Sequence, residues 1–181
     1  EARALLGVMP DGMRLLDRLS GPDFLVHVGM LHGLDASTAR ERAQELLAAL
    51  DLAEAGKKLI SDYSAGMTKK IALSAALIHS PRVLVLDEPT SGLDLGAREL
   101  LIGALSEIMK GSKSPQIILV THQIEEIPDG ATHCAIMSQG TIAHQGPIED
   151  VLTGVNLSEV YGMPLLAGRT DGRWWARGVT E

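Results

Sequence analysis

The chain has 181 residues, a formal net charge of −7 at pH 7 and a hydrophobic content of 45%. This length is enough for one or two domains with a proper core, and no apolar run approaches the roughly 18 residues that span a bilayer as a helix. The acidic balance, without a basic cluster interleaved with aromatic residues, argues against a nucleic-acid surface, so no nucleic-acid partner is expected. The single cysteine, Cys134, excludes an internal disulfide and fits a reducing compartment.

The first element that the sequence predicts is a strand within residues 4–9, which are mostly apolar. A turn should follow at Pro10, Asp11 and Gly12, since proline interrupts strand pairing and the other two residues favour turns. Residues 20–60 have the pattern of helices throughout, with no repeat or low-complexity segment. A strand, a turn and a long helical region are therefore expected in this order.

Two helices are predicted inside the helical region. Ser20 can cap the first, with Pro22 in its first turn. For the second, residues 38–41 (Thr-Ala-Arg-Glu) have the form of a capping box, which makes Thr38 the capping residue. Apolar residues then recur at helical spacing, at Ala39, Ala43, Leu46, Leu47 and Leu50.

A turn of small residues at 64–67 is predicted to open another helix. We expect this helix to begin at Thr68 and to run to about Ser80, where Pro81 stops it. Backbone N–H groups at such a helix start, together with the positive end of the helix dipole, favour a bound phosphate. The turn is therefore a candidate anion site.

Two adjacent carboxylates follow the next predicted element, a strand over residues 83–86. Its unbroken aliphatic run is typical of a strand buried on both faces in a parallel sheet. The strand ends in Asp87 and Glu88, and Pro89 prevents further pairing. Open α/β sheets bind ligands at the carboxyl ends of their strands. In a phosphate site, a strand-end aspartate typically helps to hold Mg²⁺, and its neighbour can orient or deprotonate a water molecule.

The remainder of the chain alternates helices and strands, as an α/β sheet requires. A second buried strand, expected at residues 116–120, ends in Thr121 and His122, so that two strand ends together supply Asp87, Glu88 and His122. The other predicted elements are a helix at 95–110, a helical turn at 124–127, strands at 131–137 and 141–145 with a hairpin turn at 138–140, and a helix from 147 to 152.

The last part of the chain is glycine-rich and carries Trp174 and Trp175 between two arginines. Two roles are open for this tail, docking on a partner and a strand that packs on its own domain, and the second is favoured. Cys134 lies in an apolar strand and is expected to be a buried structural thiol.

Four motifs, in order and at family spacing, resemble those of the nucleotide-binding subunits of ABC transporters. Residues 63–67 (Tyr-Ser-Ala-Gly-Met) are similar to the signature motif, and residues 83–88 are similar to the Walker B strand. Residues 91–94 (Ser-Gly-Leu-Asp) resemble the D-loop, and His122 falls at the place of the switch histidine. The signature departs from the usual Leu-Ser-Gly-Gly-Gln in a way that resembles ATPases paired with ABC-2-type exporters.

The resemblance implies an α/β fold, namely a P-loop NTPase-type parallel sheet, present in part, with an inserted α-helical subdomain. It also implies four segments along the chain: the end of a core strand with a Q-loop-like turn at 1–12, the helical subdomain at 13–63, the C-terminal half of the ATPase core at 64–154, and a tail at 155–181.

The same resemblance implies a site that binds ATP and Mg²⁺ between two ATPase subunits. In that site Glu88 would polarise the attacking water as general base, His122 would contact the γ-phosphate, and Asp87 would hold Mg²⁺. The residues implied to reach the nucleotide across the interface are Ser64, Ala65, Gly66 and Met67, with Asp94 bridging the two sites.

Three departures from the family pattern change the expected chemistry. Ala65 adds a Cβ where the family has glycine, which is costly if φ must be positive, and Met67 lacks a hydrogen-bonding amide. Asp11 stands where the family usually has a glutamine that touches Mg²⁺ and couples to the transmembrane partner. A carboxylate can approach the metal but only accepts hydrogen bonds, so Asp11 is either a metal ligand or a solvated turn aspartate.

The P-loop of the family, G-x-x-x-x-G-K-[ST], is not found in the sequence. Gly7 and Gly12 have the right separation, but Met13 and Arg14 stand where lysine and serine or threonine are needed, and arginine does not replace a compact ammonium. We therefore expect residues 1–181 to be the C-terminal part of a longer ATPase that is inactive as a fragment. The alternative is a truncated protein that never binds ATP by itself.

The leading hypothesis is an ATPase subunit that powers transmembrane transport. Its implied partners are transmembrane permease subunits and a second ATPase subunit, identical or different, and its implied location is cytoplasmic, peripheral on the inner face of the cell membrane. Two alternatives are a soluble ABC-type ATPase in translation or DNA repair and a non-hydrolysing remnant that regulates a complete ATPase. The net acidity and the form of residues 91–94 argue against the first alternative.

Overall fold

The computed structural model describes residues 2–56, 58–112 and 114–179. It divides the chain into two compact units, Glu1–Val120 and Thr121–Glu181, and each is described here by itself. A parallel sheet with helices confirms the predicted α/β class. The expected division into four segments stays a prediction.

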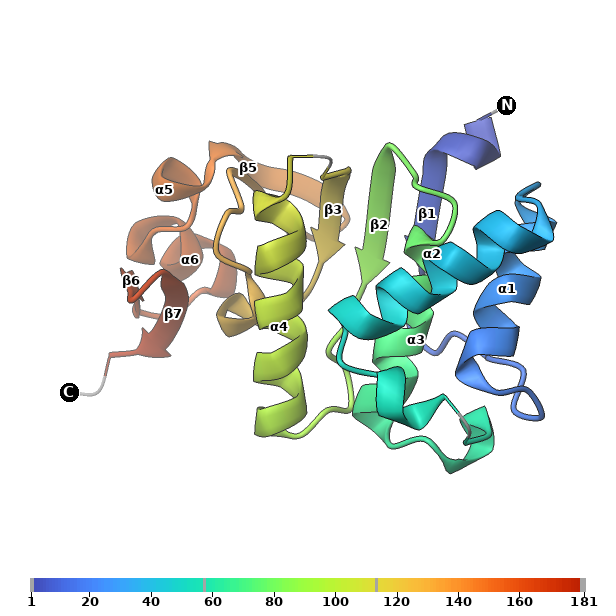
Figure 1. Cartoon of the computed structure of the whole chain (residues 1–181). Helices are drawn as coiled ribbons and strands as arrows, with labels where there is room; N and C mark the ends of the chain where they lie inside the picture. Colours follow the sequence, from blue (N-terminus) through green and yellow to red (C-terminus); the bar gives the residue numbers. More distant parts are fainter. Residues whose placement is uncertain (1, 57, 113, 180–181) are drawn as a thin grey trace. The chain divides into compact units, whose positions relative to one another are not determined.

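The first unit contains a parallel sheet of three strands in the order β1-β2-β3 (Figure 1). The strands are β1 (Leu6–Met9), β2 (Val83–Asp87) and β3 (Gln116–Val120). Met9 pairs with Leu86 and Asp87 pairs with Val120, so the three strands end at the same edge of the sheet. This is the edge at which the sequence predicts a ligand site.

Only one face of this sheet is fully buried. Leu84 and Leu86 of β2 are completely buried on that face. On the other face the side chains of the outer strands are exposed by 40–53%, at Leu6, Val8, Ile118 and Val120. Val83 and Val85 of β2 are only half-buried on this face, and β3 has no buried residue. The expectations of a strand buried on both faces at 83–86 and of a second buried strand at 116–120 are therefore wrong, because the helices of the first unit cover one face only.

The helices of the first unit are α1 (Gly21–Leu31), α2 (Ala36–Ala49), α3 (Ala65–Leu77) and α4 (Leu95–Lys110), with 3₁₀ turns at Ala2–Leu5, Ala53–Ala55 and Ile60–Asp62. The predicted cap of the first helix is confirmed, since the Ser20 hydroxyl accepts a hydrogen bond from the Asp23 N–H.

The second helix begins earlier than the capping box indicated. Asp35 is its capping residue, and the Asp35 carboxylate accepts hydrogen bonds from the N–H groups of Ser37 and Thr38. The Ser37 and Thr38 hydroxyls donate to the same carboxylate and hold the pKa of Asp35 well below its usual range. Thr38 therefore lies in the first turn, and the prediction that it caps the helix is wrong because the helix has already begun at Asp35, whose carbonyl accepts from the Ala39 N–H.

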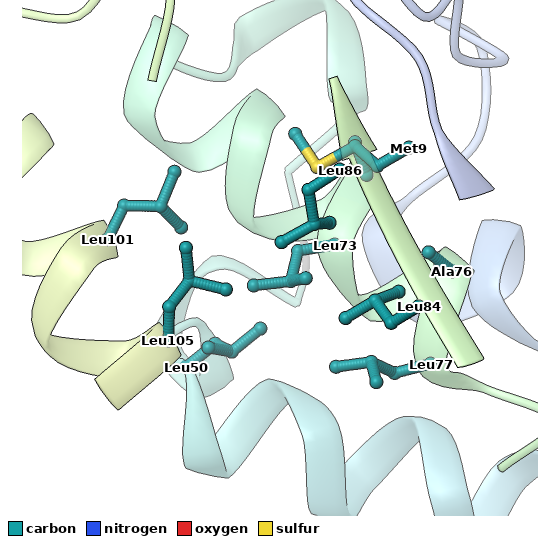
Figure 2. Close-up of a cluster of buried hydrophobic side chains, with 10 residues drawn as sticks. Met9, Leu50, Leu73, Ala76, Leu77, Leu84, Leu86, Leu101 and Leu105 are labelled. Carbon is teal, nitrogen blue, oxygen red and sulfur yellow. The ribbon is translucent and has the colours of Figure 1, made fainter. Parts of the chain in front are cut away.

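Helix α3 is buried on both of its long faces. Leu73 and Leu77 point toward Leu84 of the sheet in one apolar cluster (Figure 2). Ile71 and Ile78 belong to a second cluster, which includes side chains of α1 and α2. Every residue of α3 from Ile71 to Leu77 is buried, which requires neighbours on every side of this part of the helix, and the sheet and the helical region supply them.

The second unit consists of two antiparallel hairpins and short helices. Its elements are the 3₁₀ turn at Ile124–Glu126, β4 (His133–Ser138), β5 (Thr141–Pro147), α5 (Ile148–Val151), α6 (Gly154–Tyr161), β6 (Leu165–Thr170) and β7 (Arg173–Gly178). The predicted turn at 138–140 is confirmed, with positive φ at Gln139 and Gly140, as a two-residue hairpin turn requires.

Trp174 is buried among Ile148, Leu152 and Leu157 of the same unit, so the tail strand does pack on its own unit. Cys134 is half-buried and free, and burial raises its pKa.

A glycine in β1 allows the sheet to approach α3. A Cβ on Gly7 would lie 2.2 Å from the Ala76 carbonyl oxygen. We expect Gly7→Ala to lower the free energy of unfolding by about 1–3 kcal/mol or more, because the backbone of α3 must move. Gly103→Ala in α4 is the matched control: a Cβ there meets nothing within 4 Å, and alanine should raise stability by up to about 1 kcal/mol. Urea unfolding of both variants measures the difference, and equal effects would contradict the close approach.

We expect a histidine just after α3 to make the stability of the first unit depend on pH. His79 stacks on His32 with 3.8 Å between ring centroids, and its Nε2 donates to the Leu6 carbonyl at 3.1 Å. A carbonyl only accepts, so protonation would put a second N–H on the buried Nδ1, which has no partner among the described residues. Burial and then the neighbouring His32 lower the pKa of His79.

Since the unfolded chain binds the proton more readily, stability should fall as pH drops below the ordinary value of 6.5 toward the lowered folded pKa, and should be flat above it. We expect His79→Gln to show a smaller loss of stability than the parent between pH 7.5 and 5.5, in thermal unfolding at both pH values. An unchanged loss in the variant would exclude His79 as the cause.

Candidate functional site

The carboxyl edge of the sheet presents two carboxylates in a constrained backbone. Asp87 is the last residue of β2, and Glu88 follows it with a left-handed φ of 46°. The Glu88 N–H donates to the Val120 carbonyl at 2.9 Å, and the Glu88 carbonyl accepts from the Ser91 N–H at 3.1 Å. Such a conformation costs a non-glycine residue about 1–3 kcal/mol and persists only when its surroundings impose it. Both carboxylates are half-buried at this edge.

Asp11 lies at the same edge, in the turn that follows β1. Its Oδ1 is 3.4 Å from the Nζ of Lys69, and this ammonium also donates to the Glu88 carbonyl at 3.1 Å. The structure thus brings Asp11, Glu88 and a cation together. Lys69 was not predicted as a site residue, because nothing in its sequence position other than the basic pair after the small-residue turn distinguishes it.

The small-residue turn forms the start of α3, three residues before the predicted start at Thr68. Ser64 caps the helix, and its hydroxyl accepts from the Met67 N–H at 3.3 Å. Ala65 lies inside the helix and is not among the residues with positive φ, so the expected strain of its Cβ does not arise. The Met67 side chain packs against the apolar cluster of α1 and α2. The amides of the first turn remain a candidate anion site, as predicted from the sequence.

Asp94 caps the next helix. Its Oδ1 accepts from the Ala97 N–H at 2.8 Å, at the start of α4. A capping aspartate has a structural reason to be where it is, independent of any ligand. Its bridging role between two nucleotide sites therefore stays a prediction.

His122 belongs to the second unit and is exposed there. The loop around it is held by Thr121, whose hydroxyl donates to Glu126 Oε2 at 2.6 Å and accepts from the Gln123 N–H at 3.1 Å. Glu126 is 2% exposed, and it belongs to no motif that would distinguish it in the sequence. The expected contact of His122 with the γ-phosphate stays a prediction.

The donor set at the edge fits a metal ion that arrives with a phosphate ligand. Within the described ranges, no group of three or more His, Cys, Asp or Glu side chains is arranged to hold a metal by itself. Mg²⁺ usually takes one or two carboxylates and completes its shell with phosphate oxygens and water, which Asp87 at the strand end can satisfy. Asp11 has its negative charge balanced by Lys69 and is the weaker candidate.

The two glycines with P-loop spacing have other roles. Gly7 is a strand residue of β1, and Gly12 lies in the following turn with a φ of 64°. Neither lies in a loop that opens a helix in the described residues. An open depression with a volume of about 540 Å³ lies beside the turn and the helix start, lined by Met13, Arg14, Leu15, Asp17, Ile60, Ser61, Tyr63 and Thr68.

Comparisons with known proteins identify the family. Residues 38–127 match the family model described as "AAA domain, putative AbiEii toxin, Type IV TA system". The daunorubicin resistance ATP-binding protein DrrA3 of Streptomyces coeruleorubidus is 34% identical over 82% of this chain and 46% of its own length. The Nod factor export ATP-binding protein I of Ralstonia nicotianae is 34% identical over 93% of this chain and 53% of its own length.

The fold agrees with these relatives. A solved structure described as "An inward-facing conformation of a putative metal-chelate type ABC transporter" has a TM-score of 0.79, with 20% identity, over 96% of this chain and 71% of that one. The chain belongs to the ABC transporter ATP-binding proteins. It spans about half the length of the curated relatives it matches. No helix in the described part of the chain is both long and apolar enough to cross a membrane.

The capping contact of Asp94 can be separated from any role in nucleotide binding. We expect Asp94→Ala to lower the free energy of unfolding by about 1 kcal/mol, because α4 loses a capping acceptor, and Asp94→Ser to restore most of it. Chemical denaturation of the two variants measures the cap. A serine variant as unstable as the alanine variant would contradict capping as the source of the effect.

Proposed function

We propose that this chain is part of an ATP-hydrolysing subunit that energises an ABC transporter. The observation that carries the proposal is the carboxyl edge of the parallel sheet, where Asp87 and Glu88 end β2 beside the Asp11 turn. Parallel sheets bind ligands at this edge, and paired carboxylates are suited to metal-assisted phosphoryl transfer to water. The similarity to ABC transporter ATP-binding proteins supports the same reading.

Within this proposal the carboxylates have distinct roles. Asp87 holds Mg²⁺, which on binding neutralises charge on the phosphates. Glu88 orients the attacking water and accepts its proton as general base. His122, on the segment after β3, donates a hydrogen bond to the γ-phosphate. Asp11 can contact the metal ion only after its ion pair with Lys69 has broken.

The start of α3 is proposed to act on a second nucleotide, bound by a partner ATPase subunit. The Ser64 hydroxyl and the amides of Ala65 and Gly66 would reach the γ-phosphate of that nucleotide, and Met67, whose N–H donates to the Ser64 hydroxyl, would complete the turn. Asp94 links the two sites. The support for this proposal is that small residues and a helix N-terminus coincide at residues 64–67.

The proposed partners are transmembrane permease subunits and a second ATPase subunit, at the inner face of the cell membrane. Relatives named for drug resistance and for Nod factor export favour an exporter.

We further propose that the phosphates are cradled by a P-loop outside residues 1–181. The exposed apolar face of the sheet supports this, since parallel sheets normally have both faces covered. The second candidate is a non-hydrolysing regulator that does not bind ATP. ATP binding by the complete protein separates the two.

The test uses the complete protein with its permease partner in membrane vesicles. We expect Glu88→Gln to lower ATP turnover by about 10²–10⁴-fold, because the amide cannot accept the proton of the attacking water. Nucleotide affinity should change by less than about twofold, since an isosteric amide preserves binding contacts. Turnover and equilibrium nucleotide binding are measured on the same preparation.

Glu45→Gln is the control, because Glu45 is an exposed glutamate on α2, away from the sheet edge. It should leave turnover and binding unchanged. If the complete parent protein neither binds nor hydrolyses ATP, the regulator is correct. If Glu88→Gln hydrolyses ATP at the parent rate, the general base lies elsewhere.

A further inference from the structure

Lys69 occupies the place where three parts of the proposed site meet. It lies on α3, five residues after the capping Ser64, and its side chain is only 17% exposed. Its ammonium donates to the Glu88 carbonyl at 3.1 Å and lies 3.4 Å from Asp11 Oδ1. A lysine is rarely buried to this degree unless its charge is compensated, and both compensating groups belong to the site.

The hydrogen bond from Lys69 is made to Glu88, a residue whose backbone has an unfavourable left-handed conformation. Glu88 has a φ of 46°, a region that residues with a Cβ seldom occupy. Its N–H is held by Val120, and its carbonyl is held by the Ser91 N–H and by Lys69. The direction of the Cα–Cβ bond follows from the backbone angles, so a group that fixes this peptide also fixes where the Glu88 carboxylate points.

We propose that Lys69 is a positioning residue for Glu88. Its ammonium holds the Glu88 peptide in the left-handed conformation and ties it to the helix whose start carries the small-residue turn. This inference rests on the proposed function, in which Glu88 is the general base. Lys69 does not touch the water or the nucleotide; it acts through the Glu88 carbonyl.

Asp11 has a defined part in this arrangement. Its carboxylate is 52% exposed and balances the charge of Lys69 on the solvent side, while the Glu88 carbonyl is the inner partner. Asp11 therefore orients Lys69 and is not required as a metal ligand. An exposed ion pair is weak, so losing Asp11 should matter much less than losing Lys69.

The first experiment replaces Lys69 in the complete protein with its permease partner. We expect Lys69→Met to lower kcat by about 10–100-fold, because the Glu88 carboxylate would be displaced by up to about 1 Å. KM for ATP should change by less than about threefold. Lys69→Arg, which keeps the charge and the N–H donors, should recover at least part of kcat. Lys110→Met is the matched control, because it removes an exposed lysine that pairs with Glu107 at 3.5 Å on α4.

The second experiment asks whether Lys69 acts through Glu88. Groups that act as a unit give strongly non-additive losses. In a Glu88→Gln background, Lys69→Met should therefore cause no further loss of turnover. A further loss equal to that of the single Lys69→Met variant would overturn the proposal, as would a single variant with the parent kcat.

Asp11→Asn keeps the test decisive if Lys69→Met does not fold. We expect it to lower kcat by less than about threefold and to leave the Mg²⁺ concentration for half-maximal turnover unchanged, since only a weak ion pair is lost. A large increase in that Mg²⁺ concentration would make Asp11 a metal ligand and overturn its assignment here. A parent-like rate for Glu88→Gln would instead mean that the proposed function has failed, whatever Lys69 does.

Discussion

The burial of α3 on both faces is the constraint on which the first unit depends. One face carries Leu73 and Leu77 into the sheet cluster, and the other carries Ile71 and Ile78 into the cluster of α1 and α2. The helix cannot rotate about its axis without exposing one of these sets and burying Lys69 or Lys70 in its place, at a cost of several buried aliphatic side chains. The rotation of α3 is therefore fixed by packing, and with it the direction in which Lys69 reaches the sheet edge.

Local sequence patterns predict most helices and strands of this chain, but they do not predict every helix start or which faces of the strands are buried. The strands and helices of the sheet are close to their expected places, and the Ser20 cap was predicted from residue type alone. The start of α3 was missed because Ser64 satisfies a first-turn N–H at Met67, which makes the helix begin earlier. The capping box at Thr38 failed for a similar reason, since Asp35 caps the helix three residues earlier and accepts from the Thr38 N–H itself.

Two features of the candidate site depend on residues far apart in the chain and have no local pattern. The left-handed backbone of Glu88 is imposed by Val120 and Lys69, at separations of 32 and 19 residues by sequence number. Lys69 is recognisable only once α3 is placed against β2. The motifs that predict Asp87 and Glu88 give their chemical type, and the tertiary contacts decide their geometry.

Capping and ligand binding are compatible at the residues where both are proposed. The Ser64 hydroxyl accepts one hydrogen bond from Met67 and, like any hydroxyl, retains a proton to donate. A carboxylate has about four lone-pair positions, so the single bond from Ala97 leaves Asp94 with acceptor capacity.

The exposed face of the sheet also affects the site. Val120, the register partner of Asp87, is 49% exposed, although its carbonyl accepts a hydrogen bond from the Glu88 N–H. Hydrogen bonds and charge interactions strengthen as water is removed, so a segment that covers Val120 would tighten the same contact that positions Glu88. Covering this face of the sheet would therefore also fix the position of the Glu88 carboxylate more tightly.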